Sequence, residues 1–313
     1  MSSLSDGVLD HLRDIADAPD LTATKYELEE LIGRGGMGSV YRVYDRELDR
    51  KVALKVLAAA DPNGALATRL LLEAKILARL EHPGIVPVYD AGTLAGGRAF
   101  CVMKWVQGTR LDTWLEGSPS TLARLQLLHR ICETVAFAHA HGVIHRDLKP
   151  ENIMVGSFGE ALVMDWGVAK QLGTNEPTAS ASSGAARGLT DHGAIIGTTT
   201  WMSPEQSRGE PADQKSDVFA LGKILAFVAA DGAPPPLGAI IARATALAPV
   251  ERYPGAVELA ADIQRFLDGD AVAAYRESWP GRLKRLSRPY RPLLALLAVY
   301  AAVRLLIFFS TGV

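Results

Sequence analysis

The sequence predicts an α+β protein, and three observations support this expectation. Residues 26–45 (YELEELIGRGGMGSVYRVYD) have the pattern of two strands joined by a glycine turn. A further strand is expected at residues 50–57 and a helix at residues 69–80, so strands and helix alternate along the chain. With 313 residues, 48% of them hydrophobic, the chain is long enough for two packed lobes or one large domain.

The composition excludes several classes of protein. The formal net charge is −2 and the basic residues are not gathered before the last forty positions, so nucleic acid is not an expected partner. The two cysteines, Cys101 and Cys132, each stand in an apolar run, which favours buried free thiols over a disulfide. The first twenty residues are acidic and lack a long apolar stretch, which excludes a secretory signal.

Residues 293–309 (LLALLAVYAAVRLLIFF) form an apolar run that only Arg304 interrupts. At helical rise its length is at the short end of what crosses a bilayer, so a buried core helix and an interfacial helix are alternatives. Five basic residues precede the run and none follows it: Arg282, Lys284, Arg285, Arg288 and Arg291. The positive-inside rule then predicts a single-pass helix in the cell membrane, with the preceding chain cytoplasmic and the basic stretch near anionic lipid.

The glycine turn contains Gly33, Gly35 and Gly38. Glycines let a backbone lie close over phosphates and expose its N–H groups to them. A glycine turn before a helix, as in dinucleotide enzymes, is the alternative. Residues 40–43 continue as a strand, however, which favours a hairpin lid.

The next strand, RKVALKVL, places Lys55 among apolar neighbours. Without other evidence, a lysine in a strand usually extends its ammonium group to water. A buried ammonium group needs an anionic partner, and Glu73 on the following helix can provide it.

Two later stretches, VIHRDLKPENIMV (143–155) and ALVMDWGVAK (161–170), carry oxygen ligands. Asp147 and Asn152 are five positions apart across a loop, a spacing that lets one meet a hydroxyl while the other reaches a metal. A short hairpin and a strand then deliver Asp165 beside Asn152, and both are suited to Mg²⁺. The Asp–Trp–Gly triplet alone would be an ordinary turn.

With these motifs in order, the sequence resembles the protein kinase family, in the form found as bacterial membrane-anchored, eukaryotic-like Ser/Thr kinases. The matching motifs, between about residues 26 and 269, are GRGGMGSV, VALK, the helix Glu73, HRDLKPEN, DWG, SPE, DVFALG and ERYP. The resemblance implies a bilobal protein-kinase fold, with a β-rich N-lobe bearing one main helix, a hinge near residues 103–107 and a mostly helical C-lobe. ATP would lie in the cleft.

The resemblance also divides the chain. The expected segments are an acidic N-terminal extension (1–25), the N-lobe (26–106), the C-lobe (107–270), a basic juxtamembrane segment (271–292), the C-terminal transmembrane helix (293–309) and a short extracytoplasmic tail (310–313).

Carried over position by position, the resemblance implies catalytic roles for several residues. Lys55 would hold the α- and β-phosphates and pair with Glu73, while Asp147 would accept the proton of the substrate hydroxyl. Lys149 would neutralise the γ-phosphate, and its presence favours Ser/Thr over Tyr substrates. The two Mg²⁺ ligands would be Asn152 and Asp165. Alone, Lys149 or Asn152 would be an ordinary solvated loop residue.

The same resemblance implies an ATP site. The glycine loop would cover the phosphates, and apolar residues would line the adenine pocket above a hinge that bonds the adenine edge. The implied ATP-binding residues are Ile32, Gly33, Arg34, Gly35, Gly36, Met37, Gly38, Val40, Ala53, Lys55 and Met103, with the backbone of Lys104 and Val106.

The segment between the DWG and SPE motifs (165–205) is expected to regulate activity. Phosphate on Thr190, with Arg146 as the nearby cation, is the regulatory hypothesis, although a Ser/Thr-rich loop is equally a linker. Thr198 fits the position where Ser/Thr members of the family touch the catalytic Asp.

Three further contacts are implied. Glu205 should pair with Arg252, and Asp217 should brace the catalytic loop from below; otherwise these are surface charges. Trp166 stands where the family usually has Phe, and its indole should fill the same slot, near Leu77 and His145, with a partner for its N–H.

The passage from residue 223 to residue 250 is shorter than in the family, where an extra helix and loops help to dock protein substrates. The SPEQ motif at 203–206, Arg252 and the long Ser/Thr-rich loop favour Ser/Thr residues of proteins as substrates. With a short docking passage, the alternatives for their choice are a narrow set, a dependence on the membrane surface, or a limit to the chain itself and neighbouring copies. Two alternatives are a membrane-tethered pseudokinase scaffold and a small-molecule phosphotransferase on the same fold.

Overall fold

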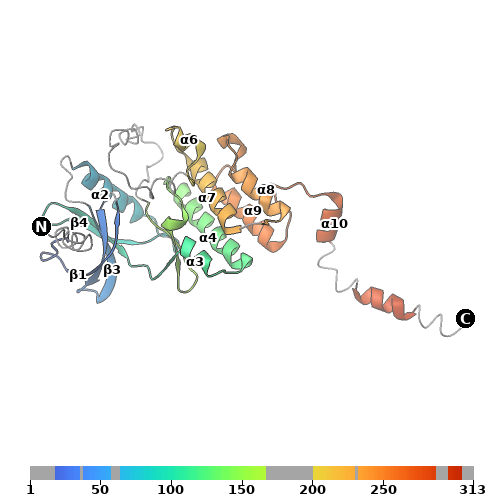
Figure 1. Ribbon diagram of the computed structural model, residues 1–313, viewed down its shortest axis with the longest axis horizontal. Coiled ribbons are helices and arrows are strands. Elements are labelled where there is room, and N and C mark those ends of the chain that lie inside the picture. The colour runs from blue at the N-terminus through green and yellow to red at the C-terminus, as the bar shows by residue number, and fades with distance from the viewer. Residues whose placement is uncertain are drawn as a thin grey trace, which may run out of the picture.

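The computed structural model describes residues 18–35, 38–57, 64–166, 200–229, 232–286 and 295–304. A sheet-rich lobe comes first in the chain and a helical lobe follows it (Figure 1). The two-lobed α+β fold expected from the sequence is therefore confirmed. Gly36, Met37, Thr190 and Thr198 lie outside the described residues, so their assigned roles stay predictions.

The N-lobe is built on an antiparallel sheet with the strand order β1-β2-β3-β5-β4. Its strands are β1 (Tyr26–Gly35), β2 (Gly38–Asp45), β3 (Arg50–Leu57), β4 (Val88–Thr93) and β5 (Ala99–Lys104). Side chains of β2 alternate between buried and half-buried, because successive residues of a strand face opposite sides. Tyr41 and Val43 thus join Val52 and Leu54 in one apolar layer.

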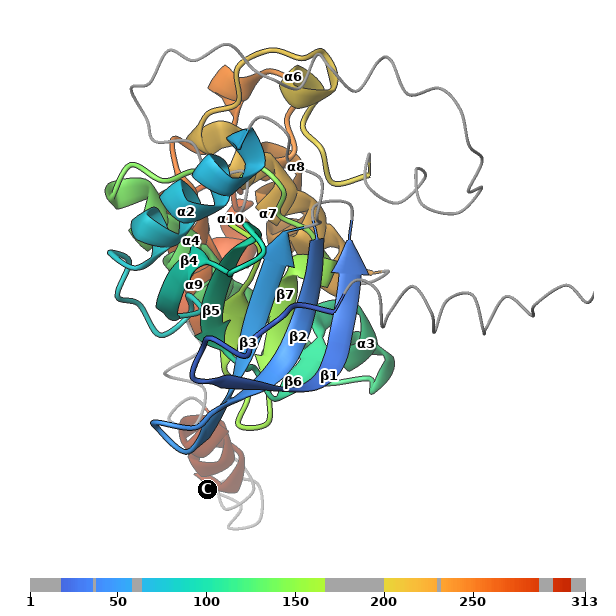
Figure 2. The same ribbon diagram turned by 90° about the vertical axis from the view of Figure 1, so that its left-hand side faces the viewer.

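Helix α2 (Ala65–Leu77) lies beside β4 and β5 (Figure 2). It begins and ends earlier than the expected range of 69–80. Leu70 and Ala74 of this helix pack against Leu57 and Cys101 of the sheet. This packing fixes the orientation of α2, and therefore the direction in which Glu73 leaves the helix.

The C-lobe combines helices with a three-stranded sheet of order β6-β7-β8. The strands are β6 (Gly108–Arg110), β7 (Ile153–Gly156) and β8 (Ala161–Val163). The helices are α3 (Leu111–Glu116), α4 (Thr121–Ala140), α6 (Pro204–Ser207), α7 (Gln214–Ala229), α8 (Pro235–Ala244) and α9 (Ala256–Asp268), with the 3₁₀ turns η1 (Pro150–Asn152) and η3 (Pro249–Glu251).

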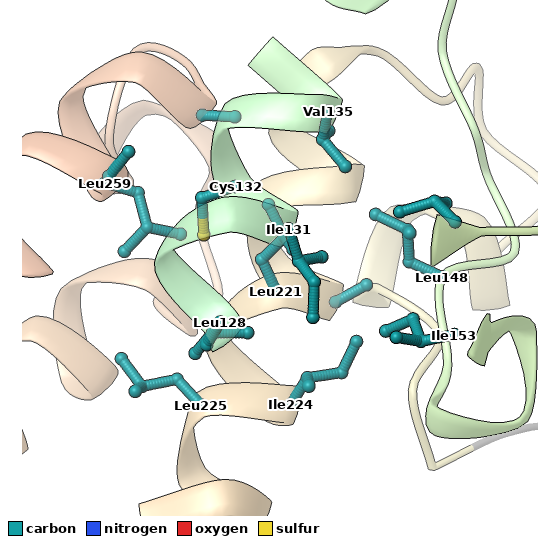
Figure 3. Packing of buried hydrophobic residues seen from close by; sticks show 14 of the residues in the cluster. Leu128, Ile131, Cys132, Val135, Leu148, Ile153, Leu221, Ile224, Leu225 and Leu259 are labelled. Atoms are coloured by element: carbon teal, nitrogen blue, oxygen red, sulfur yellow. The ribbon is translucent and has the colours of Figure 1, made fainter. Parts of the chain in front are cut away.

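Helix α4 forms the centre of the C-lobe core. Its apolar residues recur at helical spacing and face α7 and α9, as Figure 3 shows for Leu128 and Ile131 opposite Leu221 and Leu225. Burial of such side chains stabilises the fold by roughly 1.5–3 kcal/mol each. Cys132 lies in this core, where burial raises the pKa of its thiol.

Helices α7 and α8 are joined by residues 230–234 alone. They pack closely at Gly222, where an added Cβ would lie 2.6 Å from the Cβ of Ala244. A direct α7–α8 contact leaves no space for an intervening helix.

After α9 the chain is held to the lobe by Asp262, whose carboxylate is buried and accepts bonds from the backbone N–H groups of Ala273 and Ala274. Helix α10 (Trp279–Leu286) follows, and residues 295–304 are helical and exposed. Within the described parts of the chain, no helix is long and apolar enough to cross a membrane. The predicted span at 293–309 is only partly described and stays a prediction.

Candidate active site

A small cavity of about 50 Å³ brings together side chains from the sheet, from α2 and from the strand end after β8. It is lined by Lys55 of β3, Glu73 of α2, Met103 of β5, Asp165 and Trp166. Residues predicted to hold the phosphates, the metal and the adenine therefore share one site. Cys101 also lines it, a residue that the sequence interpretation left out of the site.

The pairing of Lys55 differs from the prediction. Its Nζ lies 3.0 Å from Oδ1 of Asp165, whereas Oε1 of Glu73 accepts a bond of 2.9 Å from Nε of Arg69. The expected Lys55–Glu73 pair is therefore wrong for this arrangement. The physical reason is local: Arg69 lies one helical turn before Glu73 and reaches it along α2 itself.

Glu73 is deeply placed, with only 12% of its side chain exposed. Burial raises the pKa of this carboxyl above its ordinary value, and Arg69 and Lys55 oppose the shift. Asp165 is 58% exposed, so it is the carboxylate of the cavity that remains open to a ligand.

In the predicted catalytic loop, two residues bond the carboxylate of a third. Oδ2 of Asp147 accepts a bond of 2.8 Å from Nζ of Lys149 and one of 3.1 Å from Nδ2 of Asn152. Asn152 also donates to the backbone oxygen of Asp147 at 2.8 Å. Pro150 starts the short η1 turn, and this turn brings Asn152 back toward Asp147.

Asp217 holds the loop from below, as predicted. Its buried carboxylate accepts the backbone N–H groups of His145 and Arg146, both at 2.8 Å, and lies 2.8 Å from Nε2 of His139. Burial would raise the pKa of Asp217, but the bonds from His139 and His145 hold it below its usual value. The bonds also support the left-handed backbone of Arg146, whose φ is 69°.

Trp166 fills the slot predicted for it. Its side chain is buried at 1% exposure, its Nε1–H donates to the oxygen of Val163 at 3.0 Å, and its ring lies 4.7 Å from that of His145. Leu77 lines the same cavity. The indole N–H thus has the partner that a buried Trp requires. The preceding Asp165 has a φ of 50°, a left-handed conformation that turns the chain sharply at this point.

Two predicted metal ligands lie next to each other at the strand end. The N–H of Met164, which precedes Asp165, donates to the backbone oxygen of Asn152 at 2.8 Å. Carboxylate and amide oxygens are hard ligands of the kind Mg²⁺ prefers, so this donor set fits the ion. Among the described residues no cluster of three His, Cys, Asp or Glu side chains could hold a metal.

The adenine side of the site follows the register of the sheet. Val40 pairs with Lys55, and Ala53 pairs with Met103. Gly38 is required here, because a Cβ would lie 2.1 Å from the oxygen of Val56. In the hinge, the N–H of Lys104 donates to the oxygen of Pro87 at 3.0 Å, and its contact with adenine stays a prediction.

Other predicted ATP contacts lie at the rim. Ile32 is 47% exposed, and Gly33, Arg34 and Gly35 are exposed at the end of β1. Val106 is half-buried after β5. The sequence interpretation missed Arg69 and Cys101, although Cys101 is two positions before Met103 and so faces the same side of β5.

The end of the predicted regulatory segment is fastened to the C-lobe. Glu205 and Arg252 form the predicted pair through two parallel bonds, of 2.6 Å and 2.8 Å, and both side chains are buried. Burial raises the pKa of Glu205, but Arg252 and Ser216 outweigh it and lower the pKa to about 2. Gln206 adds a bond to the oxygen of Arg146 at 2.8 Å, which ties this segment to the catalytic loop.

Comparison with known proteins agrees with this geometry. Residues 26–242 match the family described as the protein kinase domain. The chain therefore belongs to the protein kinase family, and the resemblance given by its motifs is confirmed.

Among curated proteins, the chain is 35% identical over 292 residues to serine/threonine-protein kinase PknD of Chlamydia pneumoniae, covering 78% of this chain and 31% of PknD. It is 37% identical over 220 residues to PknD of Chlamydia felis, covering 64% of this chain and 24% of that protein. The chain thus spans about a third or less of the length of these relatives.

Among solved structures, the kinase domain of Mycobacterium tuberculosis PknI is similar, with a TM-score of 0.56 and 25% sequence identity. The similarity covers 77% of this chain and 95% of the PknI kinase domain.

Proposed function

We propose that this chain is a Ser/Thr protein kinase that transfers the γ-phosphoryl group of ATP, in the presence of Mg²⁺, to hydroxyl groups of proteins and of its own chain. One observation carries the proposal. The carboxylate of Asp147 is bonded by Lys149 and Asn152, in a loop that adjoins the cavity holding Lys55 and Asp165.

The reaction assigns a role to each group of the catalytic loop. Asp147 takes the proton of the substrate hydroxyl as the new oxygen–phosphorus bond forms and the bond between the γ-phosphorus and the ADP oxygen breaks. Lys149, 2.8 Å from that carboxylate, reaches the same space and offsets negative charge on the transferred group. Orientation of the hydroxyl supplies much of the rate enhancement.

The nucleotide side depends on Lys55 and Asp165. Asn152 and Asp165 would hold Mg²⁺, which would neutralise negative charge on the phosphates. Lys55 would bond the phosphates and Asp165 the metal in competition with their own 3.0 Å ion pair, which is expected to weaken when both ligands bind. The exposure of Asp165 supports this competition, because its carboxylate is accessible to a metal–nucleotide complex from the solvent side.

We further propose that the chain acts at the cytoplasmic face of a cell membrane, through a single-pass helix at residues 293–309. The exposed apolar side chains of Leu296, Val299 and Tyr300 favour this location, since they find no packing partner among the described residues. The basic residues of 282–291 suit anionic lipid. Phosphorylation at Thr190 and contact of Thr198 with Asp147 belong to the same proposal.

Phosphate transfer from labelled ATP by the full chain, alone and with a generic protein acceptor, tests the proposal. The wild type is expected to label itself or the acceptor in a Mg²⁺-dependent way, and Asp165→Asn is expected to remove the label. Asp268→Asn is the matched control, because Asp268 is exposed on α9, outside the site. ATP binding without any labelling by the wild type would instead support the pseudokinase scaffold, and labelling of small alcohols alone would support a small-molecule phosphotransferase.

A further inference from the structure

An aromatic pair lies on the C-lobe outside the site described above. Phe227, near the end of α7, is 44% exposed. The ring of Trp201 meets it edge-on, with 5.5 Å between ring centroids and 78° between planes. Trp201 itself is half-buried against the C-lobe core. We call these two rings the Trp201–Phe227 surface.

The direct packing of α8 on α7 explains why this surface is open. The contact is made at Gly222 and Ala244. Phe227 is five positions after Gly222, so it lies about 140° around the helix from that contact. It therefore points away from α8.

The surface is continuous with the catalytic loop. Trp201 lines a small cavity together with Arg146, Asp147 and Ala220. Asp217, near the start of α7, accepts bonds from the catalytic loop. Phe227 is ten positions later, so it lies about 15 Å from Asp217 along the axis of α7. An extended peptide covers that length in about four residues.

The charges on α6 and α7 disfavour a basic ligand, and Asp147, which lines the cavity with Trp201, is already bonded to Lys149 and Asn152. Glu205 and Asp217 are the carboxylates nearest to it along α6 and α7, and both are buried and bonded within the lobe. Lys223 is one turn before Phe227 on α7, on the same side of the helix. Lys223 would repel a positively charged side chain, and these two helices offer no free carboxylate to pair with it. An apolar side chain would bury apolar surface area against both rings.

We propose that the Trp201–Phe227 surface binds an apolar side chain of the protein substrate, about four residues from the hydroxyl that accepts the phosphate. This proposal rests on the kinase function proposed above and names the kind of substrate it takes. The apolar contact would take the place of docking by the longer segment that the family resemblance predicts to be shortened between residues 223 and 250.

The test uses the full chain and peptides with one Ser, in which each position within five residues of the Ser carries Leu, Ala, Lys or Glu in turn. Phosphorylation gives kcat/KM, and binding of the same peptides with Ala in place of Ser gives an affinity independent of catalysis. The variants are Phe227→Ala and Phe227→Glu, and Val257→Ala, exposed on α9, is the matched control. Thermal unfolding verifies that each variant is folded.

Leu is expected to improve kcat/KM and affinity over Ala by roughly three- to tenfold at one position, about four residues from the Ser. Phe227→Ala removes that preference, Phe227→Glu shifts it toward Lys, and Val257→Ala leaves it unchanged. Phosphorylation with no Leu preference, or a preference that survives Phe227→Ala, overturns the proposal while the kinase function stands. Binding that depends on Leu and Phe227 without any phosphate transfer overturns the kinase function and retains the surface. A preference for Glu at that position would show that the substrate pairs with Lys223 and not with the two rings, and it overturns the proposal.

Discussion

Nζ of Lys55 lies 3.0 Å from Oδ1 of Asp165, so the residue assigned to the phosphates and the residue assigned to the metal are bonded to each other. The pair uses one oxygen of the Asp165 carboxylate, and that carboxylate is 58% exposed. We expect binding of a metal–nucleotide complex to weaken this ion pair, because the phosphates compete with Asp165 for Lys55 and the metal competes with Lys55 for the carboxylate.

This competition predicts opposite effects on nucleotide binding with and without metal. Asp165→Asn removes a metal ligand and also frees Lys55. We expect the affinity for Mg²⁺–ATP to fall at least tenfold, and the affinity for ATP in chelator to stay equal or rise. Titration calorimetry with both ligands measures this. Equal losses with and without Mg²⁺ would show that Asp165 acts on the fold rather than on the metal.

Arg69 holds Glu73 by an i,i+4 ion pair along α2. Arg69→Ala leaves Glu73 with Lys55 as its nearest cationic partner, so we expect Lys55 to be drawn from Asp165 and phosphate transfer to rise severalfold. Arg79→Ala, in an exposed residue just after the same helix, is the control. A loss of transfer with Arg69→Ala alone would mean that Arg69 supports the active arrangement instead.

Arg252 and Glu205 form a buried pair, and removal of one partner leaves a buried charge. Arg252→Met is expected to destabilise the fold by about 3–5 kcal/mol, measured by urea unfolding. Arg208→Met removes an exposed pair with Glu210, and its unfolding curve should match the wild type. Equal curves for both variants would contradict the structural role of the buried pair.

The same pair predicts acid sensitivity. The pKa of Glu205 is lowered from 4.5 to about 2 in the folded chain, so its contribution to stability is present above pH 4.5. That contribution is lost as the pH falls from 4.5 toward 2, because the unfolded chain then binds the proton first. The unfolding free energy of the wild type should therefore fall more steeply in this window than that of Glu205→Gln.

Trp166→Phe restores the residue usual in the family, but in a slot shaped by an indole. The change removes the bond to Val163 and leaves unfilled space beside Leu77, so we expect a loss of about 1–2 kcal/mol in unfolding free energy. Phosphate transfer should persist, since the Asp165 carboxylate is untouched. A gain in stability would show that the indole is strained in its slot.

Gly222→Ala places a methyl group 2.6 Å from Ala244 and is expected to cost about 1–3 kcal/mol of unfolding free energy. Gly238→Ala is the matched control, because a Cβ there meets nothing within 4 Å. That second change should be neutral or stabilising in helix α8. Similar results for the two variants would contradict close α7–α8 packing.

Much of the site was predictable from the sequence because its motifs are local. The loop from Asp147 to Asn152 closes on itself, so its spacing determines its geometry. The buried pair of Glu205 and Arg252 followed from two motifs that the family resemblance joins.

The partner of Lys55 was not predictable in the same way. It depends on how α2 sits against the sheet and on the turn at Asp165, both of which are tertiary relationships. The competing Arg69–Glu73 pair was visible as a spacing of four, but spacing alone does not decide between two cations. The exposure of Phe227 depends on how α7 and α8 pack, which no local motif predicts.

Asp147 is the proposed catalytic base of the kinase site, and comparison of the full chain with Asp147→Asn tests this role. ATP binding and phosphate transfer from labelled ATP are measured on both in parallel. If Asp147 is the base, ATP affinity should be equal within about twofold and phosphate transfer should fall at least a hundredfold in the variant. Transfer that survives in Asp147→Asn, with ATP binding unchanged, would show that Asp147 is not the base.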